Sequence, residues 1–352
     1  MIKVLVVDDS PVVQELLVHI LSTDPEIQVI GTADNGEEAL EAVKNTKPDV
    51  ITMDIHMPKA NGFDATRRIM ETYPTPIVIV SGSSSIQEVA TTFRAVEAGA
   101  LAVIPCPRGI GHPEHEATAE ELLQTVKLMS EVKVVRRWPR PSTTQKAPSH
   151  VQVSARRVPA EIQIVAVGAS TGGPLALQTF LSQLPKDFPV PLVIVQHMAR
   201  GFVQGFVEWL TQSSGFPVHV ATGGEHPLPE HAYVAPDGVH MGVGIDGRIM
   251  LSTDGPENGL RPSVSYLFRS VAQVFGRKAI GILLTGMGRD GAEELKVMKD
   301  RGAITFVQDQ DSAVVHGMPG AAIKLDAATY VLPPERIAIA LTGLVKEKGT
   351  TS

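Results

Sequence analysis

Short apolar runs alternate with amphipathic segments along most of this chain. In the first part of the sequence, five runs have the length and the β-branched character of buried strands, and a segment with helical spacing follows each of them. The predicted strands are Ile2–Val7, Gln28–Ile30, Val50–Met53, Ile77–Val80 and Leu101–Ile104. Strands that alternate with helices in this way favour a parallel sheet covered by helices on both faces.

A second array of strands and helices begins at residue 161. Three apolar runs in it end in polar or Gly-rich turns, and these strands with their turns are Ile162–Pro174, Leu192–His197 and Ala279–Gly291. One more strand is predicted at Ile304–Val307, and helices are predicted at Arg261–Phe275, Met318–Leu325 and Arg336–Val345.

Four shorter runs lie between the second and third of these strands. Gly and Pro punctuate them, which is typical of short strands joined by turns. The runs are Val218–Thr222, His231–Ala235, Val239–Val243 and Arg248–Ser252, and we expect an antiparallel insertion or edge there.

A basic stretch without Asp or Glu separates the two arrays. It is rich in Pro, Ser, Thr and Gln, so a flexible, solvated tether is favoured over a site for acidic partners. The sequence therefore predicts an α/β protein with two doubly wound parallel-sheet domains, the second carrying a short antiparallel element. The predicted limits are residues 1–132 for the first domain, 133–160 for the linker and 161–346 for the second domain.

Composition narrows the classes of function. The chain has 352 residues, 43% hydrophobic and 20% charged, as in ordinary globular proteins. A net charge of −7 gives no footprint for nucleic acid. No apolar run approaches the ~18 residues of a membrane span, and the N-terminal apolar stretch is too short for a signal peptide. A single cysteine, Cys106, excludes an internal disulfide, so we expect a cytoplasmic protein without membrane insertion.

Acidic residues follow two strands of the first domain. Asp8 and Asp9 come after the first strand and Asp54 after the third, while Ser81 follows the fourth. The carboxyl ends of parallel strands share one edge of the sheet, and carboxylates grouped there suit Mg²⁺. Ser81 could hydrogen-bond a phosphoryl group. The alternative is that the acids only cap the helices that follow.

The second domain carries a candidate nucleophile, base and orienting acid. Ser170, His197 and Asp290 each follow an apolar strand, so they converge if those strands are parallel neighbours. Ser needs a base to take its proton, and the base needs a carboxylate on its other nitrogen. Asp309 and Asp311 follow a later strand and remain alternatives to Asp290. A Gly-rich strand-to-helix turn also suits phosphate, which is the alternative for the turn itself.

Backbone N–H groups near Ser170 could stabilise an oxyanion. Gly168 is expected to turn the chain, and Gly172-Gly173-Pro174 to open a helix. The backbone at Thr171 and the Met287 N–H are the candidate donors. Five other histidines show no zinc-like spacing, so a metal role is disfavoured for them: His219, His226, His231, His240 and His316.

The first domain resembles a response-regulator receiver domain. The resemblance rests on Asp8-Asp9-Ser10, Asp54 with Met57-Pro58 and Gly62, and Ser81. It implies a flavodoxin-like fold in which a histidine kinase supplies the phosphoryl group to Asp54. It also implies that Asp8, Asp9 and Asp54 hold Mg²⁺ and that Ser81 is the switch hydroxyl.

One position departs from the receiver pattern. The family places a Lys where this chain has Cys106, immediately before Pro107. A thiol cannot supply the fixed cation, so we expect weaker coupling between phosphorylation and conformational change. A redox role for Cys106 is the alternative, although a lone Cys is more often inert.

The second domain resembles the catalytic domain of the chemotaxis protein-glutamate methylesterase family, CheB. The motifs are Gly168–Pro174, Gln196-His197-Met198, Arg261-Pro262-Ser263-Val264, Thr285–Gly291 and Gly317-Met318-Pro319. The resemblance implies a Rossmann-like esterase without its own cofactor, with Ser170 as nucleophile, His197 as base and Asp290 as orienter. Leu260 and Ser265 replace a usual His and Asp.

The two resemblances together imply a phosphorylation-regulated hydrolase of chemotaxis. It would demethylate glutamate γ-methyl esters on chemoreceptor helices, release methanol and deamidate glutamines, with the receiver covering the active-site rim until Asp54 is phosphorylated. The alternatives are the same chemistry outside chemotaxis, or a non-enzymatic module that binds partners when phosphorylated.

Overall fold

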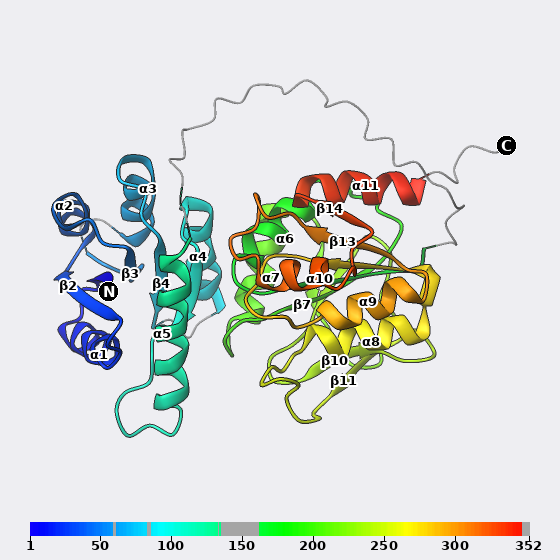
Figure 1. The fold of residues 1–352 in the computed structure, drawn as a ribbon, viewed down its shortest axis with the longest axis horizontal. Helices are drawn as coiled ribbons and strands as arrows, with labels where there is room; N and C mark the ends of the chain where they lie inside the picture. Colours follow the sequence, from blue (N-terminus) through cyan, green and yellow to red (C-terminus); the bar gives the residue numbers. More distant parts are fainter. Residues whose placement is uncertain (59–60, 83–85, 133, 135–161, 347–352) are drawn as a thin grey trace. The chain divides into compact units, whose positions relative to one another are not determined.

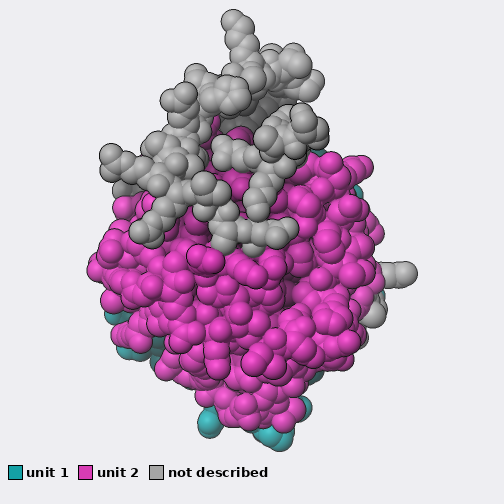
Figure 2. Space-filling view, turned by 90° about the vertical axis from the view of Figure 1, so that its right-hand side faces the viewer, with its two compact units in different colours: residues 1–146 teal, residues 147–352 magenta. Residues whose placement is uncertain are grey.

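The computed structural model describes the chain except for residues 59–60, 83–85, 133, 135–161 and 347–352. The chain divides into two compact units, residues 1–146 and 147–352, which Figure 2 shows in different colours. Nearly all of the predicted linker lies outside the described residues, so its limits stay predictions. Within the described part of the chain, no helix is both long and apolar enough to cross a membrane.

The first unit contains a five-stranded parallel sheet in the order β2-β1-β3-β4-β5. The strands are β1 (Ile2–Val7), β2 (Ile27–Ala33), β3 (Val50–Met53), β4 (Ile77–Ser81) and β5 (Ala102–Pro105). The helices are α1 (Pro11–Ser22), α2 (Gly36–Thr46), α3 (Gly62–Thr72), α4 (Ile86–Ala98) and α5 (His115–Ser130). All five predicted strands are confirmed, with the second longer at both ends than expected.

Helices cover both faces of this first sheet. α1 packs against α5 on one side, while α3 contacts both α2 and α4 on the other (Figure 1). The inner strands β1, β3 and β4 are buried along nearly their whole length, which explains their continuous apolar runs. The doubly wound arrangement leaves the carboxyl ends of β1, β3, β4 and β5 side by side.

The second unit contains a seven-stranded parallel sheet in the order β14-β13-β12-β6-β7-β9-β8. The strands are β6 (Ile164–Ala169), β7 (Leu192–Gln196), β8 (Val218–Val220), β9 (Ala232–Val234), β12 (Ala279–Leu283), β13 (Ile304–Gln308) and β14 (Tyr330–Leu332). The order in which strands are added to the sheet switches sides at β6, so β7 lies on one side of β6 and β12 on the other. Ligand sites of open α/β sheets form at such a switch point.

Helices also cover both faces of the second sheet. α6 (Gly173–Ser182) contacts α7 (Val203–Ser214) and α11 (Pro334–Lys346), while α9 (Ala292–Asp300) contacts α8 (Val264–Val274) and α10 (Gly317–Lys324) (Figure 1). The three predicted helices correspond to α8, α10 and α11.

The antiparallel element is smaller than the sequence indicated. Among the described residues, the strands that pair antiparallel are β10 (His240–Val243) and β11 (Ile249–Ser252). The first two short strands form an edge, as one of the two expectations had it, but an antiparallel direction is wrong for them, because β8 and β9 extend the main sheet and are parallel to each other. Their connection, residues 221–231, contains no helix, so in the sequence it looks like a hairpin loop. β14 was not predicted.

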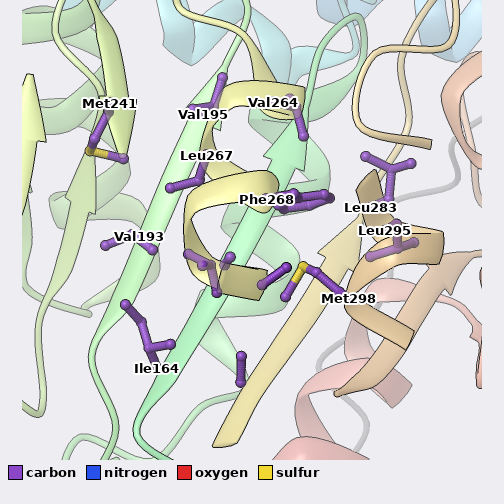
Figure 3. Close-up of a cluster of buried hydrophobic side chains, with 14 of the residues drawn as sticks. Ile164, Val193, Val195, Met241, Val264, Leu267, Phe268, Leu283, Leu295 and Met298 are labelled. Carbon is purple, nitrogen blue, oxygen red and sulfur yellow. The ribbon is translucent and has the colours of Figure 1, made fainter. Parts of the chain in front are cut away.

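A cluster of buried side chains fixes α8 against this sheet. Leu267 and Phe268 of α8 pack with Val193 of β7 and with Leu295 and Met298 of α9, and all five are fully buried (Figure 3). Apolar burial of this kind is worth roughly 1.5–3 kcal/mol for each large side chain. Because α8 is held in this way, its N-terminal turn has a fixed place at the edge of the sheet.

Candidate active site

Ser170, His197 and Asp290 come from three neighbouring strands. β6 pairs with β7 on one side and with β12 on the other, and all three run parallel. Ser170 and His197 each stand one residue beyond the last paired positions, Ala169 and Gln196. The condition set for convergence, that the three strands are parallel neighbours, is therefore met, and Asp290 lies on the turn beyond β12.

The turn at Ser170 begins later than the sequence indicated. Gly168 lies inside β6, and a side chain there would collide with Val264 of α8, so its small size serves packing and not the turn. The turn begins after Ala169, where the Ser170 N–H donates to the Thr285 carbonyl at 3.0 Å. Gly172, with φ of 77°, then starts α6 in a conformation that favours glycine.

His197 is bound to Asp290. The distance from His197 Nε2 to Asp290 Oδ2 is 2.9 Å, and both side chains are largely shielded from water. Nδ1 is therefore the ring nitrogen left to accept a proton. Among the described residues, no hydrogen bond joins the Ser170 hydroxyl to His197. Contacts between nucleophile and base often tighten only when substrate binds.

The Asp290 carboxylate accepts three more hydrogen bonds. The Ser263 hydroxyl donates at 2.9 Å, and the first N–H groups of α8, those of Val264 and Ser265, donate at 2.6 and 3.0 Å. Burial alone would raise the pKa of Asp290, but the hydrogen bond and charge of His197 and the other donors outweigh it and hold that pKa well below its usual range. The carboxylate is thus kept ionised beside His197.

The alternative orienting acids lie elsewhere. Asp309 accepts hydrogen bonds from the backbone and hydroxyl of Ser312, and Asp311 is exposed. Two of the other histidines, His219 and His231, bond to each other at 2.8 Å. Within the described residues, no group of three or more His, Cys, Asp or Glu side chains is arranged to hold a metal ion.

The second Gly-rich turn lies against Ser170. A side chain at Gly286 would come within 2.7 Å of Ser170 Cβ. The Gly286 carbonyl accepts from the Met318 N–H at 2.9 Å, and in a trans peptide the next N–H, that of Met287, points the opposite way. The side chain of Met287 is about half exposed. The motif Gly317-Met318-Pro319 thus orients the peptide that carries one candidate oxyanion donor.

Several polar residues that hold this site were not singled out from the sequence. Gln196, Ser263 and Thr285 are buried and bond to the turns that carry Ser170, His197 or Asp290. Each belongs to a motif used for the resemblance. The signal that could have identified them is a polar side chain buried next to a proposed catalytic residue. The sequence shows that such a residue lies at a strand end, but it does not show that the side chain is buried.

The first unit gathers acids at the corresponding edge of its own sheet. Burial raises the pKa of Asp8 to about 6, and the charges of Asp54 and Asp9 act in the same direction. Burial also raises the pKa of Asp54. Carboxylates that repel one another at one sheet edge, with Asp8 buried and Asp54 half-buried, fit a divalent cation. Mg²⁺ usually shares only one or two carboxylates with phosphate oxygens and waters, so the lack of a complete protein cage does not conflict with this fit.

Ser81 and Cys106 lie beside these acids. Ser81 ends β4 and is buried, and its carbonyl accepts from the Cys106 N–H at 2.8 Å. Burial raises the pKa of the Cys106 thiol to about 11, and the charges of Asp8 and Asp54 contribute. The thiol is therefore neutral at pH 7. A high pKa disfavours the redox alternative, since the thiolate is the reactive form.

The fold and these two sites define a two-domain α/β protein that joins a sheet edge carrying acids to a hydrolase-type Ser, His and Asp set. Residues 165–341 match the CheB methylesterase model, and residues 4–109 match the response regulator receiver domain. The chain belongs to the CheB methylesterase family and carries a receiver domain at its N-terminus.

Two similar curated proteins cover the chain almost end to end. One from Nitrosospira multiformis is 62% identical over 100% of this chain and 99% of its own length. One from Geobacter metallireducens is 58% identical over 99% of this chain and 100% of its own length. Both are named protein-glutamate methylesterase/protein-glutamine glutaminase. The crystal structure of the Thermotoga maritima CheB methylesterase catalytic domain aligns with 53% of this chain and 100% of that domain, at 36% identity and a TM-score of 0.51.

Proposed function

We propose that this protein is a phosphorylation-regulated serine hydrolase that demethylates glutamate γ-methyl esters on chemoreceptors and deamidates glutamines there. The observation that carries the proposal is the His197–Asp290 pair, bonded at 2.9 Å at the sheet edge where Ser170 also lies. The names of the similar proteins support the substrate class.

In the proposed reaction, the Ser170 hydroxyl oxygen attacks the ester carbonyl carbon while His197 Nδ1 takes the hydroxyl proton. Asp290 fixes the ring through Nε2 and stabilises the imidazolium that forms. His197 then returns the proton to the leaving methoxide, so methanol departs and an acyl-enzyme remains. Water attacks that acyl group by the reverse sequence and frees the glutamate carboxylate and Ser170. For an amide substrate the leaving group is ammonia.

In this proposal, two backbone N–H groups stabilise the oxyanion. The Thr171 N–H shares its peptide with the Ser170 carbonyl, and the Met287 N–H shares its peptide with the Gly286 carbonyl. Both carbonyls accept hydrogen bonds from other parts of the protein. Within the part of the chain that the structure describes, neither N–H group donates a hydrogen bond, so both are left for a substrate oxygen beside Ser170. Fixed donors of this kind stabilise charge that develops in the transition state.

In the receiver, we assign Asp54 as the phosphoacceptor and Ser81 as the switch hydroxyl. Asp8, Asp9 and Asp54 would hold Mg²⁺, which when bound neutralises charge on the phosphoryl group. A histidine kinase of the chemotaxis pathway would be the phosphodonor. The protein would act in the cytoplasm on the cytoplasmic helices of methylated receptors.

The linker assignment, residues 133–160, belongs to the same proposal. Limited proteolysis should cut first between Pro139 and Pro159, at Arg and Lys residues. The released C-terminal fragment should be folded and active without phosphorylation. A fragment that is folded but inactive would rule out a receiver that mainly restrains the esterase.

The decisive assay measures methanol release from methylated receptor membranes, with and without acetyl phosphate. Wild type should release methanol, Ser170→Ala should not, and Asp54→Ala should lose the response to acetyl phosphate. Activity on methylated proteins from outside chemotaxis, with none on receptors, would favour the alternative pathway. Absence of methanol with every substrate would favour a binding module.

A further inference from the structure

Gln196 ties the turn of the proposed nucleophile to the turn of the proposed base. It is the last residue of β7, directly before His197, and only 2% of its surface is exposed. Its Nε2 donates to the Ser170 carbonyl at 2.8 Å and to the His197 carbonyl at 2.8 Å. One amide group thus uses both of its hydrogens on the two segments that must meet for proton transfer.

The hydrogen bond to Ser170 also sets the direction of a backbone donor. The Ser170 carbonyl accepts from both Gln196 Nε2 and the Gly173 N–H, each at 2.8 Å, so its orientation is fixed by two donors. The Thr171 N–H shares that trans peptide and points the opposite way. Gln196 therefore holds the Thr171 N–H away from the amide, on the side left for the oxyanion.

The surroundings of Gln196 favour a role for its amide beyond stability. Its Oε1 is buried and has no hydrogen-bond partner among the described residues. Rotating the amide would turn Oε1 toward two carbonyl oxygens, which accept only. A side chain at Gly173 would come within 1.9 Å of Oε1, so α6 begins with a residue that leaves room for the amide. An apolar residue of the same size would avoid the unpaired oxygen.

We infer that Gln196 is a positioning residue for catalysis, which aligns Ser170, His197 and the Thr171 N–H for reaction without touching substrate. The inference rests on the proposed function, because it takes Ser170 as the nucleophile and His197 as the base. It adds a residue whose contribution should be seen in turnover and not in substrate binding.

The first test replaces the amide by an apolar side chain of similar length, Gln196→Met, in the full-length protein. Kinetics of methanol release should show kcat lowered by about 10- to 100-fold with KM changed less than about twofold, because small misplacement of reacting groups has effects of this size. The matched control is Gln178→Met, since Gln178 also donates to a backbone carbonyl, that of Ser213, but between α6 and α7. A kcat for Gln196→Met within twofold of this control would overturn the inference.

The second test, Gln196→Glu, adds a pH signature. An ionised Glu cannot donate and repels both carbonyls, whereas a protonated Glu donates one hydrogen bond. The activity of this variant relative to wild type should therefore rise as pH falls. A ratio that does not change with pH would contradict the positioning role of Gln196. This test remains decisive if Gln196→Met fails to fold.

A third measurement separates this inference from the proposed substrate. The rate at which a fluorophosphonate labels Ser170 reports nucleophile alignment without any receptor, with Ser170→Ala as the blank. Slower labelling of Gln196→Met than of Gln178→Met supports the inference even if receptor esters prove not to be substrates, and equal labelling rates count against it. Labelling that persists in Ser170→Ala would instead refute the nucleophile assignment.

Discussion

Asp290 is tightly held at the proposed catalytic site. It accepts four hydrogen bonds, from His197, the Ser263 hydroxyl and two backbone N–H groups, while 4% of its surface is exposed. A buried carboxylate with this many donors is stable as an anion. It can therefore hold the His197 ring and favour the imidazolium without taking the proton itself.

Substitution of the three proposed catalytic residues should show that they act as one unit. Ser170→Ala and His197→Ala should each remove nearly all turnover, and the double variant should be little worse than either. Asp290→Asn should lose about 10⁴-fold in kcat if its orienting role resembles other triads. Methanol release measures all of these. The assignment is wrong if Asp290→Asn keeps wild-type turnover while Asp311→Asn loses it.

The lowered pKa of Asp290 predicts a pH dependence of stability. Above the ordinary carboxyl pKa of about 4, Asp290 is ionised in both the folded and unfolded states and its stabilisation is complete. As pH falls, the unfolded state takes the proton first, so this stabilisation is progressively lost. The unfolding free energy of the catalytic domain should therefore fall less steeply with acid in Asp290→Asn than in wild type.

Urea unfolding between pH 5 and 3 provides the measurement. The chain has two tryptophans, so a Trp138→Phe background leaves buried Trp209 of α7 as the reporter of the catalytic domain. Asp311→Asn, which changes the net charge equally at an exposed position, is the control. Equal acid dependence in wild type and Asp290→Asn would show that Asp290 is not the stabilising group.

For single residues, the sequence was most informative about the proposed catalytic side chains. It was least informative about the buried residues that position them through hydrogen bonds. Ser170 and His197 directly follow strands and Asp290 lies on the turn after a third, and in such places the side-chain type indicates chemistry. The sequence could not assign Gln196 or Ser263, because their importance lies in contacts between segments far apart in the chain. Gly168 was misread for the same reason, since the Val264 side chain that requires its small size lies on α8.

Among the secondary-structure elements, α8 links the hydrophobic core to the site. Its buried face packs on the sheet, and its N-terminal turn donates to Asp290. Ser263 serves both functions, because its hydroxyl accepts from the Tyr266 N–H as the helix cap and donates to Asp290. A helix N-terminus also favours a nearby negative charge.

Removing this hydroxyl should cost both stability and activity. Ser263→Ala should destabilise the catalytic domain by about 1–2 kcal/mol through the lost cap, which corresponds to a fall of about 2–8 °C in its melting temperature. Turnover should fall as well, whereas Ser263→Thr should restore most of both. Trp209 fluorescence and methanol release follow the two effects. Asn35→Ala, which removes the cap of α2 in the receiver, should leave the Trp209 transition and basal turnover unchanged.

Element types followed from periodicity, but pairing between elements did so only in part. Buried parallel strands such as β1, β3 and β6 have continuous apolar runs that are hard to mistake. The three-residue strands β8, β9 and β14 have too few positions to show on which face or in which direction they pair. Their place is decided by the neighbouring strand, which the sequence does not reveal.

At the scale of the whole molecule, the protein joins two α/β units that have separate sheets and separate sites. The order of a receiver followed by an esterase places regulation and chemistry in one chain, with residues 133–160 as the proposed tether. The sequence could predict this division because acids cluster in one array and the Ser, His and Asp set in the other. How one unit controls the other depends on the energy that phosphorylation supplies.

The last prediction concerns that energy. If the unphosphorylated receiver keeps the esterase inactive in most molecules, moving the population from about 1:99 to 99:1 takes roughly 5.5 kcal/mol of differential stabilisation. A lysine at position 106 would supply part of it by pairing with the phosphoryl group. The neutral Cys106 thiol, whose pKa is raised in part by the charges of Asp8 and Asp54, offers no such charge. Phosphorylation of Asp54 should therefore activate the wild-type protein less than it activates the Cys106→Lys variant.

Methanol release with and without acetyl phosphate measures the ratio of activities. Cys106→Lys should raise that ratio, Asp54→Ala should reduce it to one, and the isolated catalytic domain should show no response in either background. Cys106→Ser controls for loss of the thiol without gain of charge and should match wild type. If wild type is already strongly activated and Cys106→Lys gives no larger ratio, another group supplies the switching energy. A weakened switch at Cys106 would then have to be abandoned.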